Sequence, residues 1–150
     1  MKKGIVRVID ANYNRCKEGL RVAEDIFRFI LQDDALRKRI RKLRHDLDEV
    51  AQSPVVKEGI LHRDSRADLG RKIDHLEIKR ENLSDLIYIN IQRAKESLRV
   101  MEEFFKIILP SKVATMKKMR YEIYTLEKNI LLKWPSLHHL RQKRRRKNTI

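Results

Sequence analysis

The sequence predicts an all-α fold, an antiparallel four-helix bundle built from two duplicated helical hairpins with a long loop between them. Three observations support this prediction. Apolar residues recur at helical spacing in four segments. The first and third of these segments are near copies of each other. Only four Gly and three Pro occur in 150 residues, which leaves few turns. Two hairpins that are each apolar along one stripe bury those stripes best against each other.

The first and third predicted helices, residues 9–31 and 87–109, show one pattern twice, at a shift of 78 residues. Their apolar residues follow alternating steps of four and three, which is typical of helices packed side by side. The first copy has Ile9, Tyr13, Cys16, Leu20, Ala23, Phe27 and Ile30, and the second has Ile87, Ile91, Ala94, Leu98, Met101, Phe105 and Ile108.

Each long helix is followed by a predicted partner helix. Asp33 or Asp34 is the expected N-cap of the second helix, and Pro110 breaks the chain before the fourth. The shift between the partner helices is 76 residues, so the second hairpin turn is two residues shorter. Duplication of a whole hairpin is the simplest explanation. The apolar stripes are Leu36, Ile40, Leu43, Leu47 and Val50, then Met116, Met119, Ile123, Leu126 and Ile130.

A long connection, residues 51–83, separates the two hairpins. Residues 55–61 are expected to form a short helix or an extended piece, residues 71–82 a charged loop, and Ser84 the cap of the third helix. Connections of this length are more often functional loops or lids than spacers. The predicted domains are a duplicated helical bundle over 1–135, with Trp134 packed on the bundle end, and a basic tail over 136–150.

Composition narrows the partners and the compartment. The net charge of +15 predicts anionic partners: phosphorylated small molecules, nucleotides or nucleic acid. No apolar run approaches the length that crosses a bilayer, so no membrane partner is expected. The single cysteine, Cys16, excludes an intrachain disulfide and suits a reducing, cytoplasmic environment. Its place on the apolar stripe predicts a buried small hydrophobe rather than a catalytic thiol.

Polar residues beside the stripe are also kept in both copies. Lysines at 17, 95 and 106 are expected to belong to a solvated ladder of ion pairs. Arg21 with Glu24, and Arg99 with Glu102, lie closer to the stripe, where a charge must be paired. For these two pairs, an ion-pair ladder and a ligand site are both open interpretations.

Further candidates lie at the stripe edges. A buried Asn needs a hydrogen-bond partner, so Asn12 and Asn90 predict either a hydrogen bond at the bundle end or recognition of a ligand. Arginine can form a bidentate contact with a phosphate or a carboxylate. The arginines in suitable positions are Arg15 and Arg93 on the other flank, and Arg44 and Arg120 beside the second stripes.

The loop contains Arg63, Asp64, Asp68 and Gly70 within eight positions. Such a group could hold Mg²⁺ and steer phosphates. The alternative, which the spacing alone favours, is an ordinary polar turn. The sequence has no Walker-type or GxGxxG loop and no His/Cys metal spacing.

Several motifs together resemble a known family. They are Ile9-Asp10-Ala11-Asn12-Tyr13-Asn14-Arg15, Glu18-Gly19-Leu20-Arg21-Val22, Leu43-Arg44-His45-Asp46-Leu47, Arg63-Asp64 with Asp68-Leu69-Gly70, Asn90 with Arg93, Glu96-Ser97-Leu98-Arg99, and Arg120-Tyr121 with Tyr124 and Glu127. They resemble the helical domain that is often fused ahead of thiamine-phosphate synthase and is regarded as an alternative hydroxymethylpyrimidine-phosphate kinase. The resemblance covers residues 5–130. The charged stretch 71–80 and the basic tail depart from it, and the synthase barrel is absent from this sequence.

The resemblance implies a kinase of thiamine biosynthesis that uses Mg²⁺ with ATP and converts a phosphorylated pyrimidine to its diphosphate. It implies that Asn12 and Asn90 read the aminopyrimidine or fix the arginines. Asp64 and Asp68 become candidate metal ligands or catalytic bases, with Arg63 beside them, on a loop that closes over the site. The implied phosphate-binding residues are Arg15, Arg21, Arg44, Arg93, Arg99 and Arg120, with Glu24 and Glu102 in the same site.

Two other functions remain alternatives. One is a non-catalytic module that docks on a separate thiamine-phosphate synthase and binds its substrate without ATP turnover. The other is nucleic-acid binding, which predicts affinity that falls steeply with salt. Against nucleic acid, the polar residues kept in both copies include Glu and Asn as well as Arg. The sequence leaves open whether the chain forms a homodimer.

Overall fold

The computed structural model describes residues 1–139, apart from three side chains at positions 76, 138 and 139, and this part contains helices and no strand. The all-α prediction is therefore confirmed. Residues 140–150, most of the predicted basic tail, lie outside the described part. The long helices are α1 (Lys2–Asp25), α2 (Asp34–Ala51), α5 (Leu83–Ile108) and α6 (Val113–Lys133). The short ones are α3 (Pro54–Glu58) and α4 (His75–Ile78), with 3₁₀ turns at Gly59–His62, Pro110–Lys112 and Pro135–His139.

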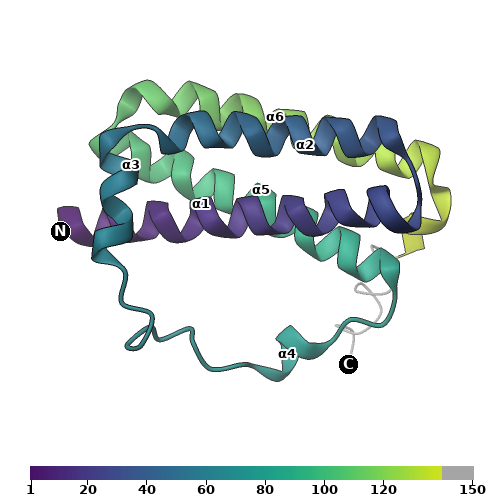
Figure 1. Ribbon diagram of the computed structural model, residues 1–150, viewed down its shortest axis with the longest axis horizontal. Helices are drawn as coiled ribbons and strands as arrows, with labels where there is room; N and C mark the ends of the chain where they lie inside the picture. The colour runs from purple at the N-terminus through teal and green to yellow at the C-terminus, as the bar shows by residue number, and fades with distance from the viewer. Residues whose placement is uncertain (140–150) are drawn as a thin grey trace, which may run out of the picture.

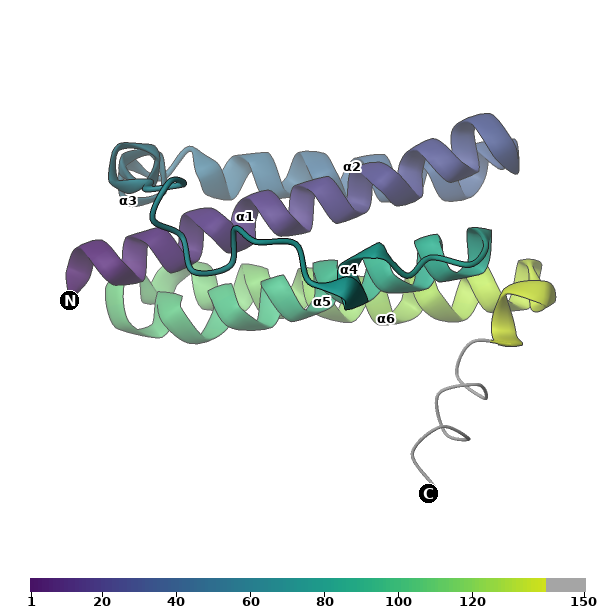
Figure 2. The ribbon, with the colours of Figure 1, turned by 90° about the horizontal axis from the view of Figure 1, so that it is seen from below.

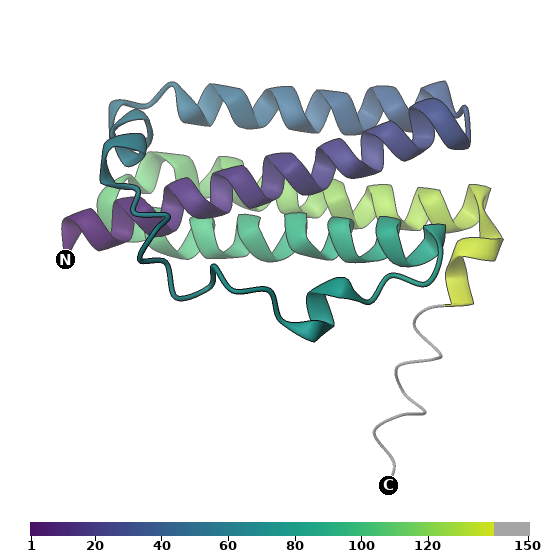
Figure 3. The same cartoon turned by 60° about the horizontal axis from the view of Figure 1, so that its bottom comes forward.

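The long helices pack as a bundle of two hairpins. Helices α1 and α2 form one layer and α5 and α6 the other (Figure 2). Helices α1 and α5 run antiparallel and make the most extensive contact of the bundle, whereas α2 and α6 touch only slightly. The connection from 63 to 82 passes the α1–α5 pair on the side away from α2 and α6 (Figures 1 and 3). No described helix is long and apolar enough to span a membrane.

The predicted stripes form the core. All five stripe positions of α2 and all five of α6 are buried, and Phe27 and Phe105 are fully buried at matching positions of the long helices. Each large side chain contributes about 1.5–3 kcal/mol on burial, an upper range because the unfolded chain is itself partly compact. Cys16 is also fully buried, and burial raises its thiol pKa to about 12, which confirms its prediction as a core residue.

Ile30 departs from the predicted stripe, because its side chain is 60% exposed. The last turn of the first helix is a π-helix, Ile26–Ile30, in which the Leu31 N–H donates to the Ile26 carbonyl at 3.0 Å. A π-turn holds more residues than an α-turn, so the side chains after Phe27 are rotated away from the position that a 3.6-residue period predicts.

The helix boundaries confirm one predicted cap and correct another. Asp33 caps α2, since its Oδ1 accepts a hydrogen bond from the Leu36 N–H at 3.1 Å. The cap of α5 is Asn82, whose Oδ1 accepts from the Asp85 N–H at 3.0 Å, and not Ser84. The predicted cap lay two residues too late because Leu83 and Ser84 already have helical geometry. The 55–61 segment is helical rather than extended.

Small residues allow the close approach of α1 and α5. A Cβ atom on Gly19 would lie 2.7 Å from the Asn90 carbonyl oxygen and 3.7 Å from the Ala94 nitrogen. Only glycine leaves room for the α5 backbone at this crossing. The contact also sets the register, because Gly19 faces the turn from Asn90 to Ala94 and the two helices run in opposite directions.

Asp33 also ties the two hairpins together at one end of the bundle. Its Oδ2 accepts from the Lys133 ammonium at 2.6 Å and from the Trp134 indole N–H at 3.1 Å. Burial alone would raise the pKa of Asp33, but the hydrogen bonds from Lys133, Leu36 and Trp134 hold it below its ordinary value. Trp134 packs against the core, as predicted, and Leu137 from the predicted tail does so as well.

Candidate functional site

Each hairpin contains a buried glutamate that binds an arginine from the partner helix. In the Glu24 cluster, Arg44 Nε donates to Glu24 Oε2 at 3.0 Å, and Arg21 lies 3.9 Å from the same oxygen. A carboxylate this deeply buried, at 1% exposure, is stable as an anion only with such a partner. The cluster lies between α1 and α2, in the half of α1 that is closer to its C-terminal end.

The Glu102 cluster repeats this geometry between α5 and α6. Arg120 Nε donates to Glu102 Oε2 at 2.9 Å, and Arg99 Nη1 donates to Glu102 Oε1 at 3.1 Å. The hydrogen bond to Glu102 raises the pKa of Arg120, which also donates to the Tyr124 hydroxyl at 2.9 Å. Because α1 and α5 run antiparallel, the two clusters lie towards opposite ends of the bundle (Figure 1). The structure therefore does not bring the four predicted arginines of these clusters into one cleft.

Asn12 and Asn90, which occupy corresponding positions of α1 and α5, are buried, and each forms a hydrogen bond within its own helix. The side-chain amide of Asn12 donates to the Val8 carbonyl at 2.8 Å, and that of Asn90 donates to the Leu86 carbonyl at 2.8 Å. Each asparagine is at most 7% exposed. The predicted hydrogen bond is thus present, but its acceptor is the preceding turn of the same helix.

Lys17 and Lys95 reach the partner helix, so their prediction as members of a solvated ladder is wrong. Lys17 binds the carboxylate of Asp48, whose Oδ1 also accepts from the Tyr13 hydroxyl at 2.7 Å. Lys95 donates to Glu127 Oε2 at 2.7 Å and is only 12% exposed. The partner helices α2 and α6 supply the acidic residues, Asp48 and Glu127. The periodicity of one helix does not reveal a partner on another helix. The Lys106 pair with Glu103, at 2.7 Å, is exposed as predicted.

Arg15 and Arg93 differ from the other predicted arginines because both are exposed and neither has an ion-pair partner in the described part of the chain. The register set by Gly19 places Arg93 near the level of Glu18 and Arg15 near the level of Glu96. These four residues mark the face of the α1–α5 pair that α2 and α6 leave uncovered, which we call the seam face. The long connection passes this face (Figure 2).

Arg93 lines a polar cavity of about 310 Å³. The other side chains around it come from the same helix: Tyr88, Ile89, Gln92 and Glu96.

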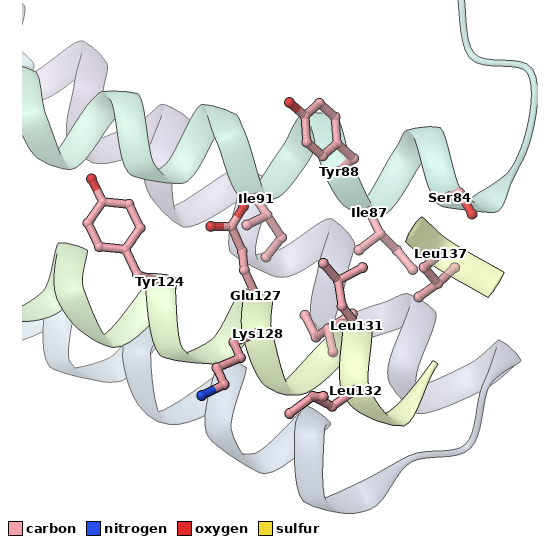
Figure 4. Close-up of a pocket in the computed structure, with 11 residues that line it drawn as sticks. Ser84, Ile87, Tyr88, Ile91, Tyr124, Glu127, Lys128, Leu131, Leu132 and Leu137 are labelled. Atoms are coloured by element: carbon pink, nitrogen blue, oxygen red, sulfur yellow. The ribbon is translucent and has the colours of Figure 1, made fainter. Parts of the chain in front are cut away.

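A second, larger pocket of about 460 Å³ lies between α5 and α6 (Figure 4). Its wall consists mainly of isoleucine and leucine side chains, and Ser84, Tyr88, Tyr124, Glu127 and Lys128 complete the lining. Figure 4 shows Glu127 directed from α6 towards α5, where it accepts hydrogen bonds from Gln92 at 2.8 Å and Lys95 at 2.7 Å. Tyr88 lines both this pocket and the Arg93 cavity, so the two are adjacent.

The predicted loop residues have separate roles in the structure. Arg63 forms a bidentate pair with the buried Asp10 of α1, and this pair raises the pKa of Arg63. Asp64 accepts from the Ala67 N–H at 3.1 Å and Asp68 from the Gly70 N–H at 2.7 Å, as in polar turns. Both carboxylates are exposed. No group of three possible metal ligands occurs among the described side chains, so the Mg²⁺ site stays a prediction.

Sequence reasoning did not single out Asp10, Tyr88, Gln92 or Lys95 as site residues. Asp10 follows a core residue directly, but its partner Arg63 is 53 positions away and periodicity does not link them. Lys95 had a usable signal, since its charge is kept in the repeat at Lys17.

The chain is similar to longer proteins. It is 34% identical over 128 residues to "Thiamine-phosphate synthase" of Nostoc punctiforme, 36% over 128 residues to that of Synechocystis, and 39% over 128 residues to that of Prochlorococcus marinus. These matches cover 85% of this chain and 35–36% of the relatives, so the chain spans about a third of their length. No solved structure shows significant similarity to it. The model of the ThiD2 family matches residues 7–129. That match covers most of the chain, which therefore belongs to the ThiD2 family.

Proposed function

We propose that this domain is a kinase of thiamine biosynthesis, which transfers the γ-phosphoryl group of ATP to hydroxymethylpyrimidine phosphate. A phosphate oxygen of the pyrimidine monoester attacks the γ-phosphorus, the bond to the β–γ bridging oxygen breaks, and ADP leaves. The products are ADP and the pyrimidine diphosphate. The names of the relatives support the pathway, and the resemblance described above supports the reaction.

This reaction needs cations more than it needs a base. A phosphate monoester has its second pKa near 6, so the attacking oxygen is already deprotonated at pH 7. Catalysis of phosphoryl transfer consists mainly of positioning and charge neutralisation. In this proposal Asp64 and Asp68 are ligands of the Mg²⁺ that binds together with ATP. Neither carboxylate has to accept a proton from the substrate.

The observation that carries the proposal is that Tyr88 lines both an apolar pocket and a cavity whose Arg93 has no ion-pair partner among the described residues. The pocket suits a flat heteroaromatic ring, because such sites are mostly apolar with a few polar groups that fix orientation. In the proposed complex the Glu127 carboxylate accepts a hydrogen bond from the exocyclic amino group. Arg93 binds the phosphate next to Tyr88, and Arg15 contributes charge on the same seam face.

We assign the buried ion pairs a supporting role. Arg44 and Arg120 are already neutralised by Glu24 and Glu102, so a phosphate would have to compete with a buried carboxylate for each of them. Arg21 and Arg99, which are about half exposed, stay candidates for phosphate binding at the cluster edges.

We also propose that the two hairpins arose by duplication. The same contacts recur at the shifts found in the sequence: Glu24–Arg44 corresponds to Glu102–Arg120, and the Asn12 hydrogen bond to that of Asn90. The halves differ where it matters for binding. Position 48, an aspartate, corresponds to Tyr124, and Asp10, which binds Arg63, corresponds to Tyr88. The proposed substrate site therefore belongs to the second hairpin.

The test is to incubate the chain with hydroxymethylpyrimidine phosphate and Mg-ATP and to follow the diphosphate by ³¹P NMR. We expect turnover in the wild type and a loss of at least about tenfold in Arg93→Ala, the size expected for one charge-assisted contact. Arg39→Ala is the matched control, because Arg39 is an exposed arginine of α2 outside both cavities.

Other outcomes would favour the alternatives. Binding of the pyrimidine phosphate without consumption of ATP would indicate a non-catalytic module of a thiamine-phosphate synthase. Equal activity of Arg93→Ala and Arg39→Ala would show that the phosphate lies elsewhere. Tight binding of oligonucleotides with a steep salt dependence, and no turnover, would indicate a nucleic-acid-binding protein.

A further inference from the structure

A second charged cavity lies at the turn between α1 and α2, outside the proposed kinase site. It measures about 460 Å³ and is lined by Phe27, Arg28, Gln32, Asp34, Arg37 and Arg41. Three guanidinium groups therefore face one carboxylate. Phe27 is its one apolar lining residue and belongs to the core, so the accessible wall is polar.

The positive charge of this cavity is only partly compensated. Arg37 binds Asp34 with contacts of 2.7 and 2.8 Å, and Lys38 binds the other Asp34 oxygen at 2.8 Å. Arg41 contacts His45 at 3.4 Å, and Arg28 lies 4.7 Å from the Phe29 ring centroid. Neither of these two arginines has a carboxylate partner in the described part of the chain. Arg37 and Arg41 are also one helical turn apart, where like charges repel.

The duplicated pattern accounts for only part of this arrangement. At the shifts of the repeat, the counterparts of Arg28, Arg37 and Arg41 are Lys106, Val113 and Lys117. An apolar residue thus takes the place of the central arginine in the other hairpin. Two of the three counterparts keep a positive charge as lysines, so only the set of three guanidinium groups is particular to the first hairpin.

The backbone around the cavity is unusual as well. Arg28 lies within the π-turn, and Gln32 has a φ of 51°, the one positive value among non-glycine residues of the described chain. Such conformations cost free energy and persist where the surrounding structure fixes them, often at binding sites. The π-turn and the turn at Gln32 directly precede α2, which supplies Arg37 and Arg41 to the same cavity.

We propose that this arginine-lined cavity is a binding site for a diphosphate group. Guanidinium groups bind phosphate oxygens in a bidentate manner, and the cavity is larger than one phosphate ion requires. Two linked phosphates would match the two arginines that lack a carboxylate partner. The proposal does not depend on the kinase activity, because none of these residues lines the pockets proposed for the pyrimidine substrate.

The single tryptophan provides a direct readout. Trp134 donates to Asp33, which lies between Gln32 and Asp34 of the cavity wall. We expect inorganic pyrophosphate, titrated at constant ionic strength, to change Trp134 fluorescence saturably, with calorimetry giving the same Kd. Arg28→Ala and Arg41→Ala should each raise the Kd about tenfold. Arg39→Ala, on the same helix but outside the cavity, should leave it within about twofold.

Competition experiments and further variants identify the ligand of this cavity. Competition by ADP would extend the site to organic diphosphates, while binding of pyrophosphate alone would restrict it to the free ion, and both results support the proposal. Absence of saturable pyrophosphate binding, or equal weakening by Arg39→Ala, would overturn it. Loss of binding in Arg93→Ala would also overturn it, by placing pyrophosphate in the kinase pocket. Preferential binding of a single-stranded oligoribonucleotide, weakened equally by Arg28→Ala, Arg39→Ala and Arg41→Ala, would overturn the proposal and indicate a nucleic-acid surface instead.

Discussion

Arg63 donates two hydrogen bonds to the carboxylate of Asp10, from Nε to Oδ2 at 2.5 Å and from Nη2 to Oδ1 at 2.8 Å. This pair attaches the start of the long connection to α1. Gly59 packs beside it, because a Cβ there would lie 2.8 Å from the Cβ of Asp10. The connection therefore leaves α1 at a fixed point, although the residues after it are exposed.

Replacing Arg63 by alanine should lower the free energy of unfolding by about 1–3 kcal/mol, because it leaves the 5%-exposed Asp10 without its partner. Urea unfolding followed by circular dichroism measures this loss. Arg66→Ala, three residues along the exposed loop, serves as the control and should be neutral. Equal stability of both variants would show that the pair contributes nothing to folding.

Removing either buried glutamate should be costly. Glu102→Ala leaves Arg120 partly buried without its carboxylate, and we expect a loss of roughly 2–3 kcal/mol. Glu24→Ala should behave alike through Arg44, whereas Glu18→Ala, an exposed site on α1, should change stability little. Unchanged stability in the glutamate variants would argue that these arginines are held for a ligand rather than for the fold.

Two glycines of α1 should respond to alanine in opposite directions. At Gly19 the new Cβ would overlap the Asn90 backbone oxygen at 2.7 Å, so α1 and α5 must separate, at a cost of about 1–3 kcal/mol. At Gly4 nothing lies within 4 Å, and alanine should stabilise the helix by about 0.5–1 kcal/mol. Thermal unfolding of the two variants measures both effects. Stabilisation by Gly19→Ala would show that the crossing is looser than described.

Acid should weaken the link between the hairpins at Asp33. The folded-state pKa of Asp33 is below its ordinary value, so the unfolded chain binds more protons in the interval between the two values. The stabilisation is therefore complete above about pH 4 and is lost as the pH falls through the folded-state pKa. Asp33→Asn keeps an N-cap acceptor but cannot titrate, so its stability should fall less steeply below about pH 4.

Unfolding at several pH values, followed by Trp134 fluorescence, checks this prediction. Glu18→Gln is the control, because Glu18 is exposed and its carboxylate has no partner among the described residues, so the pH profile should stay unchanged. Parallel acid profiles for wild type and Asp33→Asn would contradict the assignment.

The core could be predicted from the sequence because it depends on local spacing. The steps of four and three identified the buried stripes of α2 and α6 completely, and Asp33 was recognisable as a cap because capping involves neighbouring residues. Ile30 was misplaced because nothing in residue type announces a π-turn. Ser84 was misplaced because Asn82, two residues earlier, offers the same kind of acceptor.

The polar residues were harder to assign because their partners are distant in sequence. The sequence analysis predicted Arg44 and Arg120 as phosphate-binding residues, but residue type alone does not distinguish a phosphate from a buried glutamate, which is the partner of each in the structure. Arg15 and Arg93 were predicted by the same reasoning, and they are exposed and have no ion-pair partner among the described residues. Arg44 and Arg120 differ from Arg15 and Arg93 because each of the first two binds a buried glutamate of a neighbouring helix. This difference depends on how the helices pack and is seen only in the folded structure.

The long connection has a consequence for how the molecule tolerates cleavage. The hairpins are held together by the α1–α5 crossing and by Asp33 with Lys133 and Trp134, none of which lies in the segment 64–79, whose described side chains are exposed. A chain nicked by protease within this segment should therefore remain one particle, and two separately expressed fragments divided there should reassemble by complementation.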